Sequence, residues 1–331
     1  MKNMMKFVLA ALMGTIGCLC ASAQTSEMGG YLFAHTGEGS GRYYRLYYAV
    51  SRDGITWTAL NGGEQPMPEY YGFPYITSDN DGNYYLIGTT DGELPHSPVI
   101  WKSKDLIEWN KIILDSSIMD LPEHYENDTN SYGAMKIFFD PVSERFMITW
   151  HASLKRYEKG KNHWKSMRTF YVLTEDFSEF TEAQQLFDFD GPDRTMAQID
   201  ASIHYYNGIY YAVVKDERWR DNISTEVEEQ KVVRIARSRN LTGPYTNLGC
   251  GVTPEWREAP TLVRSIDGIR YFLYVEDYGN HRYELYASES IERNGRWDKI
   301  EITPPENCRH GCIIKIDEET FNNLNNHYET H

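Results

Sequence analysis

The sequence predicts an all-β protein built as a five-bladed β-propeller. Two observations indicate this fold. A short turn motif recurs five times along the chain, and a hairpin rich in aromatic residues precedes most of its copies. Helical periodicity is scarce. Repeated units of about 50 residues, each made of four short strands and set around an axis, are typical of propeller blades.

The turn motif is clearest at 51–57 (SRDGITW), and it returns at 103–109 (SKDLIEW) and at 174–180 (TEDFSEF). Looser copies start at Ser238 and Ser288, so successive starts lie 52, 71, 64 and 50 residues apart. In each copy a side-chain oxygen can accept hydrogen bonds from backbone amides. Each copy therefore predicts a tight turn whose aromatic residue anchors the next strand.

Four strands lead the predicted blades, at 72–76, 134–139, 199–203 and 258–262. The N-terminal blade lacks a leading strand, whereas 309–316 is a C-terminal strand without a blade. We therefore expect the C-terminal strand to pair with the N-terminal hairpin and close the ring, which removes exposed strand edges. A β-sandwich also spaces short strands regularly, but five copies of one turn favour the propeller.

The first 23 residues have the form of a secretory signal peptide. Lys2 and Lys6 precede an apolar run at 7–17, and the small residues 21–23 form a cleavage site before Gln24. A lipoprotein anchored through Cys18 or Cys20 is the alternative, and the residues before these cysteines fit it poorly. We expect a secreted or periplasmic protein with a single propeller domain over 24–331.

Composition excludes several classes of partner. The full chain has a net charge of −15, and loss of two lysines with the leader makes it −17. A strongly acidic surface repels nucleic acid and anionic membranes. No later apolar run is long enough to insert into a bilayer. The three remaining cysteines, Cys250, Cys308 and Cys312, do not form a disulfide framework. Cys308 and Cys312 are expected on one face of the closing strand, and a bridge involving Cys250 stays open.

Charged residues at the heads of inner strands indicate where the chemistry lies. Inner strands line the central channel of a propeller, and their starts ring one mouth of it. Asp200 and Glu258 stand at two of these starts, and His310 stands at the head of the closing strand. Acids are rarely buried unless they are paired or functional. The two carboxylates are therefore candidate acid and base groups.

The same stretches resemble glycoside hydrolase family 43. The strand 199–203 (IDASI), followed by Tyr at 210–211 and by 215–217 (KDE), is similar to the third blade of that family. The strand 258–262 (EAPTL) is similar to its fourth blade, and 309–311 (RHG) is similar to the closing strand of one branch. The resemblance covers nearly the whole chain after the leader. It implies a five-bladed propeller that hydrolyses arabinofuranosyl, xylosyl or galactosyl side chains of plant-type polysaccharides with inversion.

On this template Glu258 is the general acid, and Asp200 orients it and tunes its pKa. An inverting enzyme also needs a carboxylate that activates water. In the family this base is an aspartate before a proline in the first blade, but here Phe73 precedes Pro74. In the second blade Lys136 replaces an acid of the family pattern.

Three explanations for the missing base stay open. Another acid reaches the mouth from a loop, and the candidates are Glu69, Asp128 and Glu38. Alternatively, His35 or His310 orients the water. The third explanation is a carbohydrate-binding propeller that derives from the same family and is catalytically impaired.

The expected partner is an oligosaccharide or polysaccharide. Aromatic faces stack on sugar rings, and basic side chains can donate to hydroxyls. The candidate contacts are Tyr71, Phe73, His35, Trp256, Arg257, Arg309 and His310. The chemistry requires no cofactor. A structural Ca²⁺ or another cation in the central channel would be held by His310 through water, because hard cations prefer oxygen ligands. A histidine satisfied by backbone carbonyls is an equally good interpretation of His310.

Overall fold

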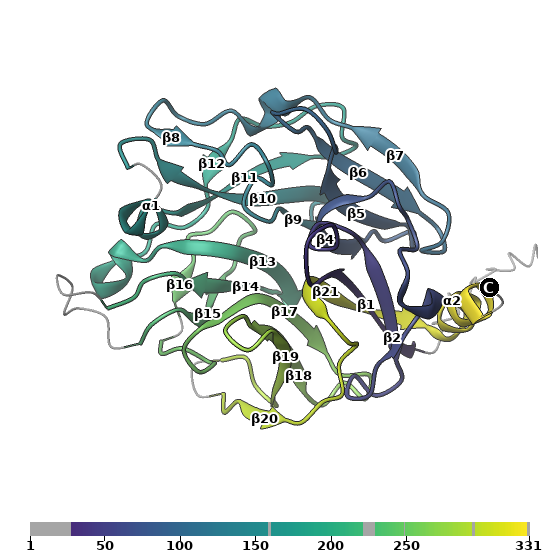
Figure 1. Cartoon of the computed structure of the whole chain (residues 1–331). Coiled ribbons are helices and arrows are strands. Elements are labelled where there is room, and N and C mark those ends of the chain that lie inside the picture. The colour runs from purple at the N-terminus through teal and green to yellow at the C-terminus, as the bar shows by residue number, and fades with distance from the viewer. Residues whose placement is uncertain (1–27, 158–159, 221–228, 248, 293–294, 330–331) are drawn as a thin grey trace, which may run out of the picture.

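The computed structural model describes residues 28–157, 160–220, 229–247, 249–292 and 295–329, which form five sheets arranged around a central axis (Figure 1). The predicted signal peptide lies outside these residues. All pairings between neighbouring strands within the sheets are antiparallel. The structure confirms the predicted five-bladed propeller.

Four blades follow one another along the chain. Blade 1 contains β4 (Tyr71–Ser78), β5 (Tyr84–Thr89), β6 (Pro98–Ser103) and β7 (Asn110–Ile113). Blade 2 contains β8 (Tyr125–Glu126), β9 (Lys136–Asp140), β10 (Arg145–Leu154), β11 (Arg168–Thr174) and β12 (Gln184–Gln185). Blade 3 contains β13 (Gln198–Tyr206), β14 (Ile209–Asp216), β15 (Val232–Ser238) and β16 (Thr246–Asn247). Blade 4 contains β17 (Arg257–Arg264), β18 (Tyr271–Asp277), β19 (Arg282–Ser288) and β20 (Asp298–Ile300).

The fifth blade joins the two ends of the chain. The C-terminal strand β21 (Cys308–Asp317) pairs with β1 (Met28–Gly37), which continues to β2 (Tyr47–Ser51) and β3 (Thr58–Ala59). Figure 1 shows β21 in yellow beside the purple β1. This pairing is the predicted closure of the ring.

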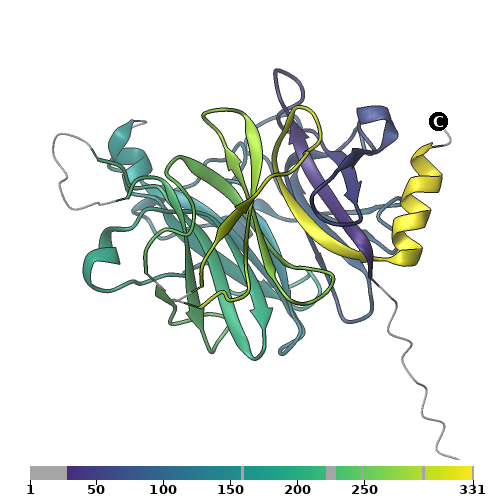
Figure 2. The ribbon, with the colours of Figure 1, turned by 90° about the horizontal axis from the view of Figure 1, so that it is seen from below.

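A C-terminal helix was not expected from the sequence. Helix α2 (Glu318–Glu329) follows β21 directly and lies against the outside of the fifth blade (Figure 2). It buries only Phe321, Leu324 and Tyr328 in an otherwise polar stretch. A Cβ on Gly30 would lie 2.6 Å from the Phe321 ring, so the glycine makes room for the helix. Three apolar residues in twelve give a weak helical signal in the sequence. Most of the stability of the helix therefore comes from its packing on β1.

Short helices occupy connections between the strands. They are α1 (Lys161–Lys165), η1 (Asn61–Gly63), η2 (Ser116–Met119) and η3 (Gly191–Thr195). Within the described ranges, no helix is both long and apolar enough to span a bilayer.

The repeated turns form as their sequence predicts. In the first copy the amides of Ile55 and Thr56 donate to Asp53 Oδ1 at 2.7 and 2.9 Å, and the Gly54 amide donates to Ser51 Oγ at 2.9 Å. The second copy, at 103–109, makes the same set of bonds around its serine and aspartate. Polar side chains thus cap each turn locally, which explains why the motif could be found without tertiary information.

The expectation that Cys308 and Cys312 share a face is wrong. Cys308 packs with Phe33 in one core cluster, whereas Cys312 packs with Ala34 in another. The register between β1 and β21 shifts between His35 and Thr36. Such an irregularity moves later side chains to the opposite face. Both cysteines and Cys250 are free thiols, so the bridge left open for Cys250 is not formed.

Candidate active site

A cavity of about 500 Å³ opens at the centre of the ring. Every blade contributes to its wall. The described residues that line it are Tyr43, Tyr44, Phe73, Asp128, Ser131, Gly133, Ala134, His151, Trp164, Ile199, Asp200, Lys215, Glu217, Trp219, Lys231, Glu258, Tyr278 and His310. Its volume falls within the range of roughly 300–1,000 Å³ that is usual for small-molecule sites.

Irregular pairing at the heads of two inner strands places the acids at this cavity. On β13, Asp200 and Ala201 lie between the paired residues Ile199 and Ser202, and the register shifts there. An equivalent shift follows Glu258 on β17. Asp200 has a φ of 52° and Ala259 has a φ of 49°, both in the left-handed region. Bulges of this kind re-aim side chains and are common beside active sites.

Asp200 is buried among basic side chains. Its Oδ2 accepts a hydrogen bond of 3.1 Å from the amide of Ala259, the residue after Glu258. Its own amide donates to His151 Nδ1 at 3.4 Å. Burial alone would raise the pKa of Asp200, but the surrounding basic groups, His310, Lys136, His151 and Lys215, hold it below its ordinary value. Asp200 therefore carries a fixed negative charge and ties blade 3 to the strand that bears Glu258.

Lys215 links two acids in the wall of the cavity. Its Nζ lies 2.8 Å from Glu258 Oε2 and 2.9 Å from Glu217 Oε2, and the side chain is 2% exposed. Burial opposes the ammonium form, but Glu258 and Glu217 raise the pKa of Lys215 above its ordinary value. Glu217 also pairs with Lys231. Glu258 is thus held in place by a buried cation, while its side chain remains 19% exposed toward the cavity.

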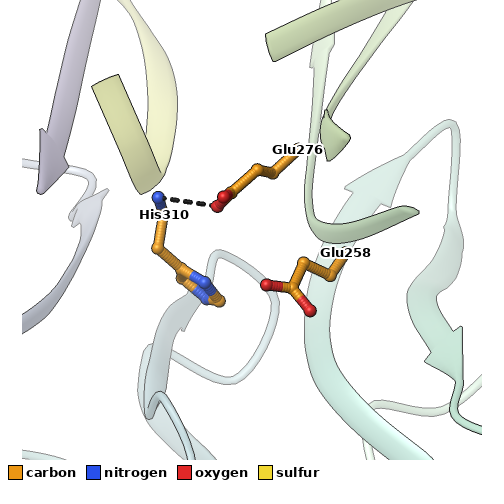
Figure 3. Close-up of side chains that lie close together, drawn as sticks. All are labelled: Glu258, Glu276 and His310. Carbon is orange, nitrogen blue, oxygen red and sulfur yellow. Dashed lines mark hydrogen bonds between the residues drawn. The ribbon is translucent and has the colours of Figure 1, made fainter. Parts of the chain in front are cut away.

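A second carboxyl group lies behind Glu258. Glu276 on β18 accepts hydrogen bonds from Arg309 and from the His310 amide, the latter at 3.0 Å (Figure 3). Burial and the nearby Glu258 raise the pKa of Glu276 to about 7, although Arg309 opposes this shift. One ligand atom from each of Glu258, Glu276 and His310 lies within 4.8 Å of the others.

This cluster meets part of what a cation site requires. The imidazole of His310 is 6% exposed, and neither ring nitrogen has a hydrogen-bond partner. One nitrogen and two carboxylates suit a transition metal, whereas Ca²⁺ would need several further oxygens from water. Each carboxylate already has a cationic partner, Lys215 for Glu258 and Arg309 for Glu276. A metal ion would therefore compete with these ion pairs.

Aromatic side chains occupy the first-blade side of the cavity. Phe73 contacts the imidazole of His310 with ring centroids 4.6 Å apart, and Tyr43 and Tyr44 pack against Phe73 at 5.4 and 5.0 Å. The part of β4 that faces the cavity thus presents the phenyl ring of Phe73. Of the candidate sugar contacts, Phe73 and His310 lie in the cavity wall.

The candidate bases divide into two groups. Asp128 lines the cavity, and its carboxylate also accepts hydrogen bonds from the Asn130 amide and the Ser131 hydroxyl at 3.1 and 3.0 Å. Glu69 is exposed and is not among the residues of the wall. Glu38 pairs with His281 at 2.5 Å, also outside the wall.

Several predicted substrate contacts lie outside the cavity wall. The side chain of His35 is buried, and its Nδ1 is bonded to the Thr36 carbonyl at 2.8 Å. Arg257 pairs with Glu284 and Asp277 inside blade 4. Arg309 pairs with Glu276, and Tyr71 stacks on Tyr44, so both lie behind residues of the site. Trp256 is 42% exposed, and its ring centroid lies 6.4 Å from that of Tyr278.

Sequence reasoning missed much of the wall. Lys215 and Glu217 stand in the stretch that carries the resemblance, but they had no assigned role. Tyr43, Tyr44, His151, Lys231, Tyr278 and Trp164 had no signal that separates them from the many aromatic and charged residues of the chain. Only Lys215 and Glu217 could have been found, because a lysine at the buried end of a strand requires a carboxylate partner.

Comparison with known proteins identifies the class. A family model related to glycoside hydrolase family 43, described as a probable glycosyl hydrolase domain, matches residues 26–322, and the chain belongs to this family. No curated protein matches the chain.

Solved structures show the same fold at low sequence identity. A bifunctional GH43-CE protein of Bacteroides eggerthii has 16% identity and a TM-score of 0.54, with 86% of this chain and 36% of that chain covered. A thermostable family-43 glycoside hydrolase has 13% identity and a TM-score of 0.53 over 85% and 98%. An inulosucrase from Halalkalicoccus jeotgali bound to kestose has 13% identity and a TM-score of 0.51 over 78% of each chain. The chain spans little more than a third of the Bacteroides eggerthii protein.

Proposed function

We propose that the protein is an inverting glycosidase that removes arabinofuranosyl, xylosyl or galactosyl side chains from plant-type polysaccharides. One observation carries the proposal. Asp200 and Glu258, from adjacent blades, meet at one cavity, and Asp200 is bonded to the backbone beside Glu258. The family of the chain and the carbohydrate bound to one similar structure support a sugar as the ligand.

In this mechanism Glu258 donates a proton to the leaving glycosidic oxygen, and Asp200 holds the strand that carries it. Four described carboxylates line the cavity, and they are Asp128, Asp200, Glu217 and Glu258. Asp200 is buried under basic groups, and Glu217 is paired with two lysines. Asp128 is therefore the best candidate to activate water. Inversion requires this base to act from the opposite face of the sugar.

The function is tested with Glu258→Gln on two substrates that share one sugar. In an oligosaccharide the leaving group is a sugar alkoxide, which needs a proton from the acid. In a p-nitrophenyl glycoside the leaving group is a stable phenolate, which needs little protonation. We expect kcat/KM to fall about 10²–10⁴-fold on the oligosaccharide and much less on the nitrophenyl glycoside. NMR of the first anomer released reports inversion. Glu69→Gln, at an exposed acid outside the wall, is the matched control. Equal losses on both substrates would contradict a proton-donor role.

A carbohydrate-binding propeller without catalysis is the second candidate. The observation that favours it is Phe73, whose ring fills the first-blade side of the wall between His310 and Tyr44. Calorimetric binding of oligosaccharides without turnover by the wild-type protein, on arabinosides, xylosides and galactosides alike, would establish this function and exclude the glycosidase.

We also propose that His310 is the residue that would hold a cation in the channel, directly or through water. Its buried ring, whose nitrogens make no hydrogen bond, supports this role. Titration of the protein with Ca²⁺ or Zn²⁺ in a calorimeter, with His310→Ala as the comparison, measures the affinity independently of activity. Binding that is unchanged in the variant would reject the assignment.

A further inference from the structure

A second cavity, of about 640 Å³, adjoins the candidate active site. Asp128, Gly133, His151 and Trp164 line both cavities, so the two are neighbours that share part of their walls. Most residues of the second cavity lie on or beside blade 2. Its remaining described lining residues are Leu94, Glu126, Asn127, Thr129, Asn130, Ala152, Ser153, Lys155, Tyr157, His163 and Met167.

Structural additions to blade 2 form the walls of this cavity. Strand β8 pairs with the end of β10 and gives this sheet a fifth strand, whereas the other described sheets have four. The helix α1 carries Trp164 beside the same region. The sequence shows the addition as the longest spacing between turn motifs, 71 residues between Ser103 and Thr174. Extra length in a repeat unit commonly builds a loop on the binding face.

The chemistry of the wall fits a neutral, hydroxyl-rich chain. Trp164 is 44% exposed at the boundary between the cavities, and its indole offers an apolar face with a polar edge. Among the described residues of the second cavity, the carboxylates of Glu126 and Asp128 and the ammonium of Lys155 leave no excess positive charge. Such a wall does not attract phosphate or polyanions. The exposed side chains of Thr129 and Lys155 can bond hydroxyl groups, whereas the Asn127 amide is already bonded to Met119 and Trp150.

We propose that the second cavity is a subsite for the sugar units joined to the one in the central cavity, with Trp164 as the stacking residue. This inference rests on the proposed function and makes it more specific. The ligand is an oligosaccharide or a polysaccharide branch of several units that runs over blade 2, and a single terminal sugar fills only part of the site.

Calorimetry with defined sugars tests the subsite. The probes are xylotetraose, arabinotetraose and galactotetraose, each compared with its monosaccharide. We expect one tetrasaccharide to bind the wild-type protein at least tenfold more tightly than its monosaccharide. Trp164→Ala should weaken the binding of the tetrasaccharide about tenfold and the binding of the monosaccharide less. Ile269→Ala is the control, because Ile269 is also a large exposed apolar side chain and lines neither cavity.

A second variant addresses the second cavity alone. Thr129 is exposed and lines only that cavity, so Thr129→Trp fills it without touching the core. Thr129→Trp should weaken the binding of the tetrasaccharide about tenfold and leave the binding of the monosaccharide unchanged. The subsite is rejected if both variants bind the tetrasaccharide as the wild type does, or if no tetrasaccharide binds more tightly than its monosaccharide.

The outcomes separate this inference from the proposed function. Loss of tetrasaccharide affinity in the two variants, in a protein that hydrolyses no glycoside, would keep the subsite and reject the glycosidase. Hydrolysis that depends on Glu258, with tetrasaccharide binding insensitive to Trp164 and Thr129, would keep the glycosidase and reject the subsite.

Discussion

At the scale of single residues, Asp200 is the best-defined member of the site. It contacts blade 2 through His151 and blade 4 through the Ala259 amide, and Lys136 and Lys215 lie among its basic neighbours. An acid that is buried and ionised persists only where such partners compensate it. Asp200 is therefore built to stay charged, which suits a residue that positions another group and does not itself transfer a proton.

Replacement of Asp200 by asparagine tests that role. The amide oxygen can still accept from Ala259, so we expect a folded protein whose kcat/KM falls about 10²-fold through misplacement of the reacting groups. The loss should appear mainly in kcat, because a misplaced reacting group raises the barrier of the chemical step. A loss of activity that is confined to KM would contradict a role of Asp200 in positioning the reacting groups.

At the scale of the element, blade 4 shows how an expected substrate contact becomes structural. Arg257, at the start of β17, reaches across the sheet to Glu284 on β19, where Lys299 and Tyr286 also bond the same carboxylate. Burial opposes ionisation of Glu284, but these bonds lower its pKa to about 2. The sequence suggested Arg257 as a sugar contact because it precedes Glu258, but its side chain points to the acid on β19.

Glu284→Gln should make the stability of this blade less sensitive to acid. A carboxyl whose pKa is lower in the folded protein stabilises it above the ordinary pKa near 4.5, and this contribution is lost as pH falls toward about 2. We expect the variant to lose roughly 2 kcal/mol of unfolding free energy at pH 7. The difference from wild type should shrink below about pH 4.5. Urea unfolding at several pH values measures it, with exposed Glu289→Gln as the control. A difference that stays constant with pH would refute the ion-pair explanation.

At the scale of the whole molecule, closure of the ring depends on close approach of β1 and β21. A Cβ on Gly311 would collide with the Ala34 carbonyl and lie 2.7 Å from His35 Cα. Gly311 also sits beside His310, so the strand that closes the ring is the strand that brings a fifth wall to the cavity. The contact between β1 and β21 at Gly311 therefore contributes both to the stability of the ring and to the position of His310 in the site.

Gly311→Ala is expected to cost about 1–3 kcal/mol through overpacking of two backbones. The thermal midpoint should fall by several degrees. Gly279→Ala is the control, because the nearest atom to its Cβ would be 3.7 Å away at an exposed position. Equal midpoints for Gly311→Ala and wild type would show that the two ends of the chain separate without loss of stability.

The sequence by itself determined the five blades, the closure of the ring and the two acids at the inner strands. These features follow from local causes: capped turns, alternating strands and polar residues at strand heads. The tertiary structure decided which charges meet. Lys215 and Glu258 are 43 positions apart, and Asp200 and Ala259 are 59 apart.

Tertiary structure also decided the opposite faces of Cys308 and Cys312 and the shared wall of the two cavities. Side-chain direction at a bulge and contacts between blades depend on the register of paired strands. That register is set by the packing of the whole ring, so no short stretch of sequence carries it.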